Sequence, residues 1–203
     1  MSAKLIAITG GIGSGKSVVS QLLRIMGYTV YDCDERAKWV MTHDELLGSE
    51  LCALFGPDTY LPTTNGTWEL NKPYLSDKIF SSADALAKIN ACVHPAVWRD
   101  MQTQLAAATR DRFFFESAIL YESGFNRLSS PDEVWAVSAP LELRIQRAMQ
   151  RDNASREKIL SRIDSQMPQD EKDRRADHTI LNDDTHSVIA QVRELLRIHF
   201  YIE

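Results

Sequence analysis

The sequence has little of what extracellular, membrane and nucleic-acid-binding proteins need. Its 203 residues include only three cysteines and no CxxC pair or Cys/His cluster, so neither disulfides nor structural zinc are expected. No apolar run approaches the roughly 18 residues of a membrane-spanning helix. A formal net charge of −5 argues against a broad surface for nucleic acid or anionic membrane. We therefore expect a cytoplasmic protein that contacts neither nucleic acid nor membrane.

Two signatures of GTPase switches are also missing. The motif D-x-x-G does not occur, and residues 71–74, the nearest match to N-K-x-D, lack the aspartate that reads guanine. The chain is also too short for a large ATPase machine. Its length suits one domain, or one core carrying small insertions.

Short apolar segments alternate with amphipathic segments along most of the chain. Strands are predicted at residues 5–8, 29–31, 112–115, 134–138 and 178–181. Helices are predicted at residues 16–26, 96–108, 141–152, 156–166 and 187–199. This alternation predicts an α/β fold with a doubly wound, mainly parallel sheet covered on both faces.

Residues 35–93 differ from this pattern. Helical segments surround an irregular stretch, residues 56–70, which contains two prolines and the turn pair Asn65-Gly66. Asn71 and Ser82 are predicted to cap the helices that follow them. Because no strand pattern is visible here, we predict a helical insertion into the α/β core.

Four of the nine glycines lie together, directly after the first predicted strand. Residues 10–17, GGIGSGKS, match G-x-x-x-x-G-K-[ST], the phosphate-binding P-loop. Glycines let backbone N–H groups turn inward, and the helix that follows aims its positive end at the same anion. Lys16 would reach the β- and γ-phosphates, and the Ser17 hydroxyl would hold Mg²⁺. The sequence thus predicts a P-loop NTPase fold that binds ATP with Mg²⁺.

Asp32 and Asp34 follow the second predicted strand, at the sheet edge where ligands bind in doubly wound folds. An extended backbone would point both side chains the same way. One would orient or deprotonate an acceptor hydroxyl, and the other would hold Mg²⁺ through water. The spacing does not decide which, and Asp34 is also a suitable helix N-cap.

Arg144, Arg147 and Arg151 share one helical face at spacings i, i+3 and i+7. Beside a P-loop, such cations stabilise the transferred phosphoryl group, and their helix pair suits an arginine-rich lid. A solvated charged face is the alternative interpretation. Glu122, beyond the strand at residues 112–115, is a candidate for contact with substrate or metal, whereas the lone His94 is more typical of a structural role.

This ordered set of motifs resembles the dephospho-coenzyme A kinase family over nearly the whole chain. The resemblance rests on TGGIGSGKS from Thr9, the Asp32-x-Asp34 pair, His94-Pro95, the ILYE ending at Glu122, RIQRAMQRD from Arg144, SRIDSQ ending at Gln166 and TILN ending at Asn182. Lys72 departs from the family pattern, because an arginine is common at that position.

The resemblance implies that ATP phosphorylates the ribose 3′-hydroxyl of dephospho-CoA, giving CoA and ADP in the last step of coenzyme A synthesis. It also implies three parts. These are a nucleotide-binding core (residues 1–34, 94–139 and 176–203), a helical acceptor domain (35–93) and a lid (140–175). A monomer or weak homo-oligomer is expected.

The resemblance also assigns residues to roles. Asp34 would accept the 3′-hydroxyl proton, Lys16 and Arg147 would stabilise the phosphates, and Asn182 would contact the ATP base. The predicted ATP site comprises Gly11, Ile12, Gly13, Ser14, Gly15, Lys16, Ser17, Val18, Arg144, Arg151 and Asn182. The predicted substrate-binding residues are Asp34, Lys72, His94 and Glu122, and the predicted metal ligands are Ser17 and Asp32.

Two other functions fit the P-loop and the arginine helix. One is another P-loop kinase that acts on a nucleoside monophosphate or a small metabolite. The other is a regulatory protein that binds nucleotide without catalysis, which would show no acceptor-dependent turnover.

Overall fold

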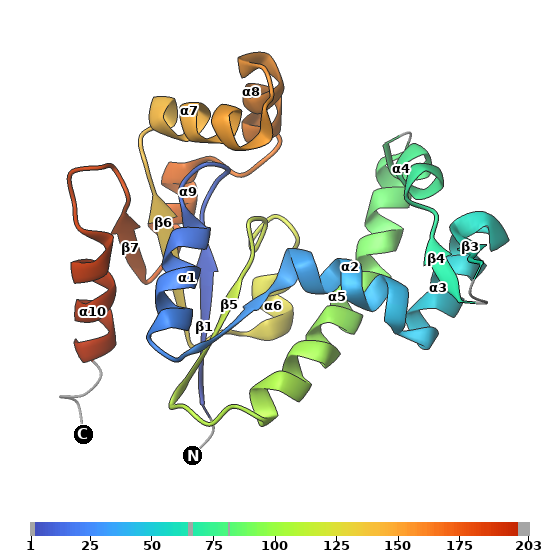
Figure 1. The fold of residues 1–203 in the computed structure, drawn as a ribbon, viewed down its shortest axis with the longest axis horizontal. Helices are drawn as coiled ribbons and strands as arrows, with labels where there is room; N and C mark the ends of the chain where they lie inside the picture. The colour runs from blue at the N-terminus through green and yellow to red at the C-terminus, as the bar shows by residue number, and fades with distance from the viewer. Residues whose placement is uncertain (1–2, 65–66, 81, 199–203) are drawn as a thin grey trace. The chain divides into compact units, whose positions relative to one another are not determined.

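Buried apolar strands form a five-stranded parallel sheet in the order β2-β5-β1-β6-β7 (Figure 1). The computed structural model describes residues 3–64, 67–80 and 82–198. The strands are β1 Lys4–Thr9, β2 Thr29–Asp32, β5 Arg112–Glu116, β6 Glu133–Ser138 and β7 His178–Leu181. The predicted α/β fold with a parallel sheet is confirmed, and each predicted strand agrees with the structure to within two residues.

The chain divides into two compact units. The sheet belongs to the first unit, Met1–Asp32 with Ala108–Glu203, and the second unit is Cys33–Ala107. In the first unit, helices α1 (Lys16–Ile25) and α10 (Val188–Ile198) pack on one face of the sheet. The core there is built around Phe114 and Trp135, whose rings meet edge to face with centroids 5.3 Å apart.

The opposite face of the sheet is covered by shorter helices. Phe115 of β5 meets Phe125 of α6 (Phe125–Ser129), and α9 (Gln169–Arg175) lies against β6. Neither helix was predicted, because α6 has only five residues and α9, QDEKDRR, has no apolar stripe. The fold therefore buries both faces of the sheet, as near-continuous apolar strands require.

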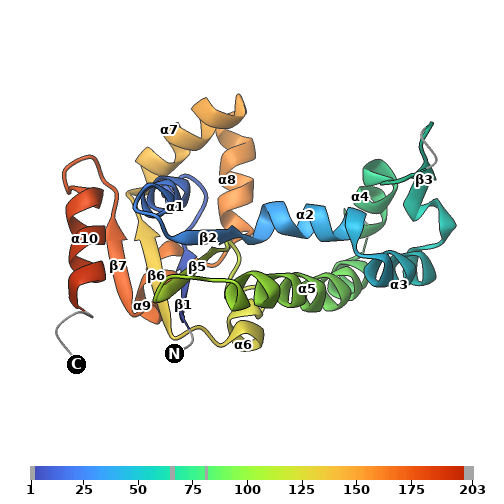
Figure 2. The same cartoon turned by 60° about the horizontal axis from the view of Figure 1, so that its bottom comes forward.

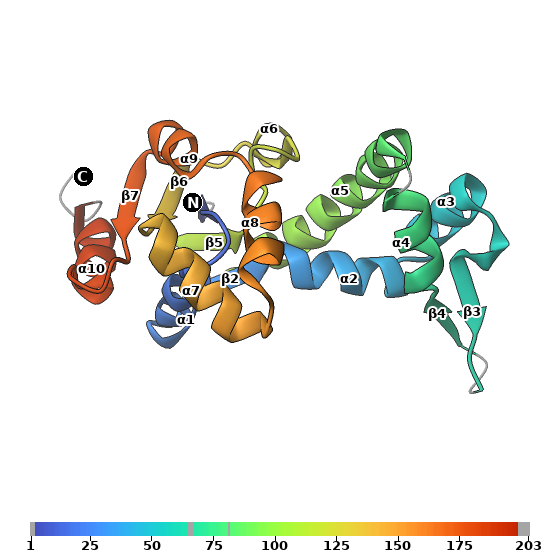
Figure 3. The same cartoon turned by 90° about the horizontal axis from the view of Figure 1, so that it is seen from above.

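Helices α7 (Leu141–Asp152) and α8 (Arg156–Asp164) follow one another and pack together at an angle in the first unit (Figures 2 and 3). Ile145, Ala148 and Ile159 form a small core of their own between these helices. The arginine-rich helices predicted at these positions are confirmed, and α8 ends two residues earlier than expected.

The second unit is mainly helical but also contains a strand pair. Its helices are α2 Cys33–His43, α3 Glu45–Phe55, the 3-10 turn η1 Pro57–Thr59, α4 Lys72–Phe80 and α5 Ala83–Ala106. Strands β3 (Tyr60–Pro62) and β4 (Trp68–Leu70) pair antiparallel, so the prediction of an insertion without strands was wrong. Three-residue strands interrupted by Pro62 give too short a pattern to detect. The predicted turn pair Asn65-Gly66 lies outside the described residues.

The helix expected to begin at residue 96 is the second half of α5, which runs unbroken through His94 and Pro95. A proline inside a helix costs about 3 kcal/mol. The neighbouring residues Val93, Ala96 and Val97 are buried, and the packing of this stretch offsets that cost. The domain boundary expected at residue 93 therefore falls inside α5. The predicted caps are confirmed, since Asn71 accepts a hydrogen bond from Tyr74 N–H and Ser82 from Ala85 N–H.

Two expectations from composition can be compared with the described part of the chain. None of its helices is long and apolar enough to cross a membrane. No disulfide joins Cys33, Cys52 and Cys92.

Helix α3 offers a matched test of the core of the second unit. Leu51 is fully buried, whereas Leu54, on the same helix, is 45% exposed. We expect Leu51→Ala to lower the free energy of unfolding by about 2–5 kcal/mol, because it leaves a cavity. Leu54→Ala should lower it by less than about 0.5 kcal/mol. Urea denaturation followed by circular dichroism measures both, and equal losses would contradict this packing.

Candidate functional site

The P-loop connects the central strand β1 to α1, and its shape depends on glycine. Gly13 and Gly15 have φ angles of +76° and +96°, in the left-handed region that side chains disfavour. A Cβ atom on Gly13 would also overlap the backbone carbonyl oxygen of Arg144. The sharp backbone turn predicted for the glycine cluster is thus visible in the structure. The direct packing of the loop against α7 is a second reason for glycine, and the sequence did not predict it.

Several polar groups of the loop are available for a ligand. Within the described residues, the N–H groups of Gly13, Gly15 and Ser17 have no hydrogen-bond acceptor. The buried hydroxyls of Thr9 and Ser14 also lack a partner there. Buried polar groups are rarely left unsatisfied, so this cluster of donors next to a helix N-terminus indicates an anion site. Lys16 Nζ donates to the Gly10 carbonyl at 2.9 Å, which keeps the ammonium at the loop.

Acidic side chains lie at the carboxyl ends of neighbouring strands. Asp32 ends β2 and is in register with Glu116 at the end of β5. Glu116 accepts a hydrogen bond of 2.6 Å from the Ser20 hydroxyl of α1. Carboxylate and hydroxyl oxygens, such as those of Asp32 and Ser17, are the ligands that Mg²⁺ prefers. Mg²⁺ is usually bound by one or two carboxylates together with substrate phosphates, so this donor set fits it.

The three arginines predicted to share a face of α7 have different partners. Arg144 is buried and donates to the Ile12 carbonyl at 3.0 Å. Burial lowers the pKa of the Arg144 guanidinium, and Asp173 opposes that shift. Arg147 donates to the Asn182 carbonyl and to Asp184.

Arg151 lies at the last turn of α7 and pairs with Asp152 at 2.7 Å. Asp152 also accepts from Arg162 of α8 at 2.6 Å. The structure therefore brings Arg144 to the P-loop and Arg147 to the turn after β7. Arg151 pairs with Asp152 of its own helix, and Asp152 in turn joins α7 to α8 through Arg162.

Asn182 follows β7 and its side-chain amide contacts the P-loop. The Nδ2 atom donates to the Ser14 carbonyl at 2.9 Å, and a Cβ atom on Gly15 would overlap this amide. Because Arg147 donates to the Asn182 carbonyl, these residues meet at one place. The structure therefore brings together a predicted base-contacting residue, a predicted phosphate-stabilising residue and the P-loop.

Glu122, a candidate for contact with substrate or metal, is bound to other protein groups. Its Oε1 atom accepts from Lys172 Nζ at 2.6 Å and from Met167 N–H at 2.8 Å. Lys172 is fully buried and also donates to the Ala118 carbonyl. Burial acts to raise the pKa of Glu122, but hydrogen bonds from Lys172 and the backbone outweigh it and lower the pKa. Burial lowers the pKa of Lys172, and the pairing with Glu122 opposes that shift.

Two glutamines that received no role in the sequence analysis also contact the P-loop. Gly11 N–H donates to Gln169 Oε1 at 2.8 Å, and Ile12 N–H donates to Gln166 Oε1 at 2.9 Å. Gln166 was part of a recognised motif, but Gln169 and Lys172 lie in a charged stretch that resembles a solvated face. No periodicity in the sequence would have singled them out.

Three residues predicted to bind the acceptor substrate belong to the second unit. Asp34 is exposed and lies in the first turn of α2, inside the helix rather than at its N-cap. Lys72 is exposed at the start of α4, and His94 is half-buried within α5. Burial lowers the pKa of the His94 imidazole, which favours its neutral form.

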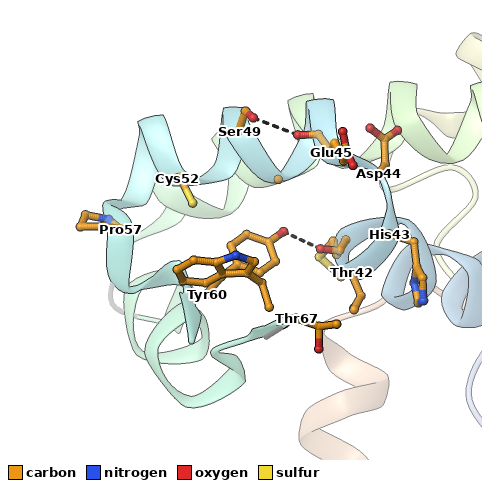
Figure 4. Close-up of a pocket in the computed structure, with 12 residues that line it drawn as sticks. Thr42, His43, Asp44, Glu45, Ser49, Cys52, Pro57, Tyr60 and Thr67 are labelled. Carbon is orange, nitrogen blue, oxygen red and sulfur yellow. Dashed lines mark hydrogen bonds between the residues drawn. The ribbon is translucent and has the colours of Figure 1, made fainter. Parts of the chain in front are cut away.

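The second unit also contains a cavity of about 870 Å³ between α2, α3 and the β3–β4 pair (Figure 4). The Tyr60 hydroxyl donates to the Met41 carbonyl beside it, and burial raises the pKa of Tyr60 to about 12. Trp68 lines the cavity and is 62% exposed. Asp34, Lys72 and His94 are not among the lining residues.

A parallel sheet whose central strand leads through a P-loop into a helix defines the fold of the P-loop kinases. Shikimate kinase from Acinetobacter baumannii, only 14% identical, shares this fold with a TM-score of 0.55 over 99% of this chain and 96% of that chain.

Sequence comparison is more specific. The family model described as dephospho-CoA kinase matches residues 4–187. The dephospho-CoA kinase of Bacteroides fragilis is 43% identical over 201 residues, covering 96% of this chain and 95% of that protein. A crystal structure of a Thermus thermophilus protein, 34% identical, matches with a TM-score of 0.81 over all of both chains. The chain belongs to the dephospho-CoA kinase family, which confirms the resemblance found in its motifs.

The close packing of Gly13 gives a sharp test of the P-loop. We expect Gly13→Ala to weaken ATP binding at least tenfold, because the backbone strain of about 1–3 kcal/mol and the overlap with Arg144 must deform the loop. Gly48→Ala is the matched control, since a Cβ atom there meets Tyr60 at no less than 3.8 Å. Titration calorimetry with MgATP measures both, and an unchanged dissociation constant for Gly13→Ala would exclude this loop geometry.

Proposed function

We propose that the chain transfers the γ-phosphoryl group of ATP to the ribose 3′-hydroxyl of dephospho-CoA, giving CoA and ADP. This is the last step of coenzyme A biosynthesis and the activity of the family to which the chain belongs. The observation that carries the proposal is the P-loop itself, with its open N–H groups and buried unpartnered hydroxyls.

The donor half of the reaction needs positioning and charge stabilisation rather than covalent catalysis. The N–H groups of Gly13, Gly15 and Ser17, with the positive end of α1, hold the polyphosphate. Lys16 leaves the Gly10 carbonyl and donates to the β- and γ-phosphates. Ser17 and Asp32 hold Mg²⁺, which when bound neutralises charge on the same phosphates.

The α7–α8 pair supplies the remaining cations. Arg147 and Arg144 stabilise the negative charge that spreads over the transferred phosphoryl oxygens, and Asn182 contacts the base. Residues 140–175 act as the lid, with Asp152 of α7 holding Arg162 of α8. The separate small core of this helix pair supports that role, because it lets the pair keep its shape.

The acceptor half belongs to the second unit. Asp34 accepts the proton of the 3′-hydroxyl as the nucleophile attacks, and its exposure leaves the carboxylate accessible to a substrate. Residues 35–93, including Lys72 and His94, bind dephospho-CoA. A cavity of about 870 Å³ in this unit supports a ligand-binding role, since pockets for small molecules are typically about 300–1,000 Å³.

A panel of acceptors tests the activity directly. ADP release should be rapid with dephospho-CoA and far slower with AMP, CMP and shikimate. AMP and CMP present a ribose 3′-hydroxyl but lack the pantetheine arm that would bind the acceptor domain, and shikimate is not a nucleotide. A coupled assay at fixed MgATP measures each rate. Turnover with another member of the panel would assign the chain a different acceptor, and ATP binding without any turnover would support a regulatory role.

Substitutions of Asp34 and Asp32 should change different kinetic properties of the enzyme. We expect Asp34→Asn to lower kcat about 10²–10⁴-fold with an unchanged dissociation constant for ATP, because it removes the proton acceptor but no contact to the donor. Asp32→Asn is the matched variant, and it should instead raise the Mg²⁺ concentration needed for half-maximal rate. An equal loss of ATP binding in Asp34→Asn would make that residue a metal ligand or a folding residue.

A further inference from the structure

The segment that joins α8 to α9 holds the beginning of the P-loop. Gln166 and Gln169, on either side of Met167 and Pro168, accept the N–H groups of Ile12 and Gly11 at 2.9 and 2.8 Å. These contacts join residues more than 150 positions apart in the sequence. In both contacts a glutamine side chain accepts a hydrogen bond from a backbone N–H group of the P-loop. Such N–H groups are the ones that a P-loop ordinarily presents to phosphate.

The glutamines divide the loop into two parts. The N–H groups of Gly11 and Ile12 donate to acceptors within the protein, and Ser14 N–H donates to the Gly11 carbonyl at 3.1 Å. The N–H groups of Gly13, Gly15 and Ser17 remain open, as far as the described residues show. Because an N–H group donates essentially one strong hydrogen bond, this division fixes which donors face the phosphates.

The orientation of Gln169 is itself fixed. Its Nε2 atom donates to Asp173 Oδ1 at 2.7 Å and to the Val137 carbonyl at 3.2 Å, so Oε1 faces Gly11. Asp173 in turn accepts from the Ser138 hydroxyl at 2.7 Å. The amide is thus oriented by the end of β6, an interior strand of the sheet.

The Glu122–Lys172 pair holds the same segment from the other side. Glu122 accepts from Met167 N–H, between the two glutamines, while Lys172 lies three residues after Gln169. Lys172 also donates to the Ala118 carbonyl beyond β5. Moving the glutamines away from the loop would therefore separate the buried Lys172 ammonium from its carboxylate partner and leave that charge unsatisfied.

We propose that Gln166 and Gln169 are positioning residues that hold Gly11 and Ile12 in the shape that binds ATP, with Glu122 and Lys172 fixing the segment that carries them. The inference rests on the proposed function, since it concerns the same P-loop, and it assigns Glu122 a role in the donor site. The glutamines touch neither substrate nor reacting atoms in this assignment. Their effect passes through the loop backbone, and it should appear in ATP affinity.

The test compares leucine variants, which keep side-chain bulk but remove the acceptor oxygen. Gln166→Leu and Gln169→Leu should each weaken ATP binding about tenfold. A loop that loses such a hydrogen bond is no longer kept in its ATP-binding conformation before ATP arrives. Gln150→Leu is the matched control, since Gln150 is exposed on α7. Calorimetry with MgATP measures all three.

A local readout separates positioning from general loss of stability. In ATP-free protein, amide hydrogen exchange should accelerate about tenfold at Ile12 in Gln166→Leu and at Gly11 in Gln169→Leu. Gln166→Glu keeps an acceptor oxygen at the same reach and should restore the protection of Ile12. The Gln166 variant disturbs fewer contacts, because its side chain accepts this one hydrogen bond while the side chain of Gln169 makes three.

The outcomes are decisive without any acceptor assay. ATP affinities that match Gln150→Leu, or exchange that accelerates evenly over the whole first unit, would overturn the proposal. Weaker ATP binding together with the residue-specific exchange pattern would support it. Because both measurements omit dephospho-CoA, a failure of the proposed acceptor activity would be seen separately.

Discussion

The structure of the nucleotide site depends on the close approach of the P-loop backbone to its neighbours. Gly13 packs against the Arg144 carbonyl and Gly15 against the Asn182 amide, so a side chain at either position would displace a neighbouring element. This packing explains why the loop can be both glycine-rich and well defined. The entropy that glycine loses on folding is offset by contacts from α7, from the turn after β7 and from the segment before α9.

Much of the first unit could be predicted from the sequence, because its signals are local. Buried strands are short apolar runs, the P-loop has its own spacing, and α7 carries a clear apolar stripe. Less of the second unit could be predicted from the sequence. Strands β3 and β4 are too short for a period-two pattern, and Pro95 suggested a helix start although it lies inside α5. There, tertiary packing prevails over local preference.

The candidate site divides in the same way. Spacing placed Arg144, Arg147 and Arg151 on one face of a helix, but it could not say which partner each would meet, because that depends on how α7 lies on the sheet. Glu122 was found as a candidate, although its partner Lys172 was not. Contacts between residues 45 to 158 positions apart carry no signal in a single sequence. Chemistry-bearing residue types can therefore be found from the sequence, while the residues that hold them in place need the fold.

The pairing of the buried Lys172 with the partly exposed Glu122 also limits how this sequence can change over time. Losing Glu122 alone would leave the Lys172 ammonium in the interior without its counter-charge, at a cost of about 3–5 kcal/mol, a large part of the total stability of a typical domain. Replacing both by well-packed apolar residues is often neutral. Natural variation that removes the Glu122 carboxylate should therefore also replace Lys172, and relatives that keep the lysine alone should have compensating changes near Ala118 or Met167.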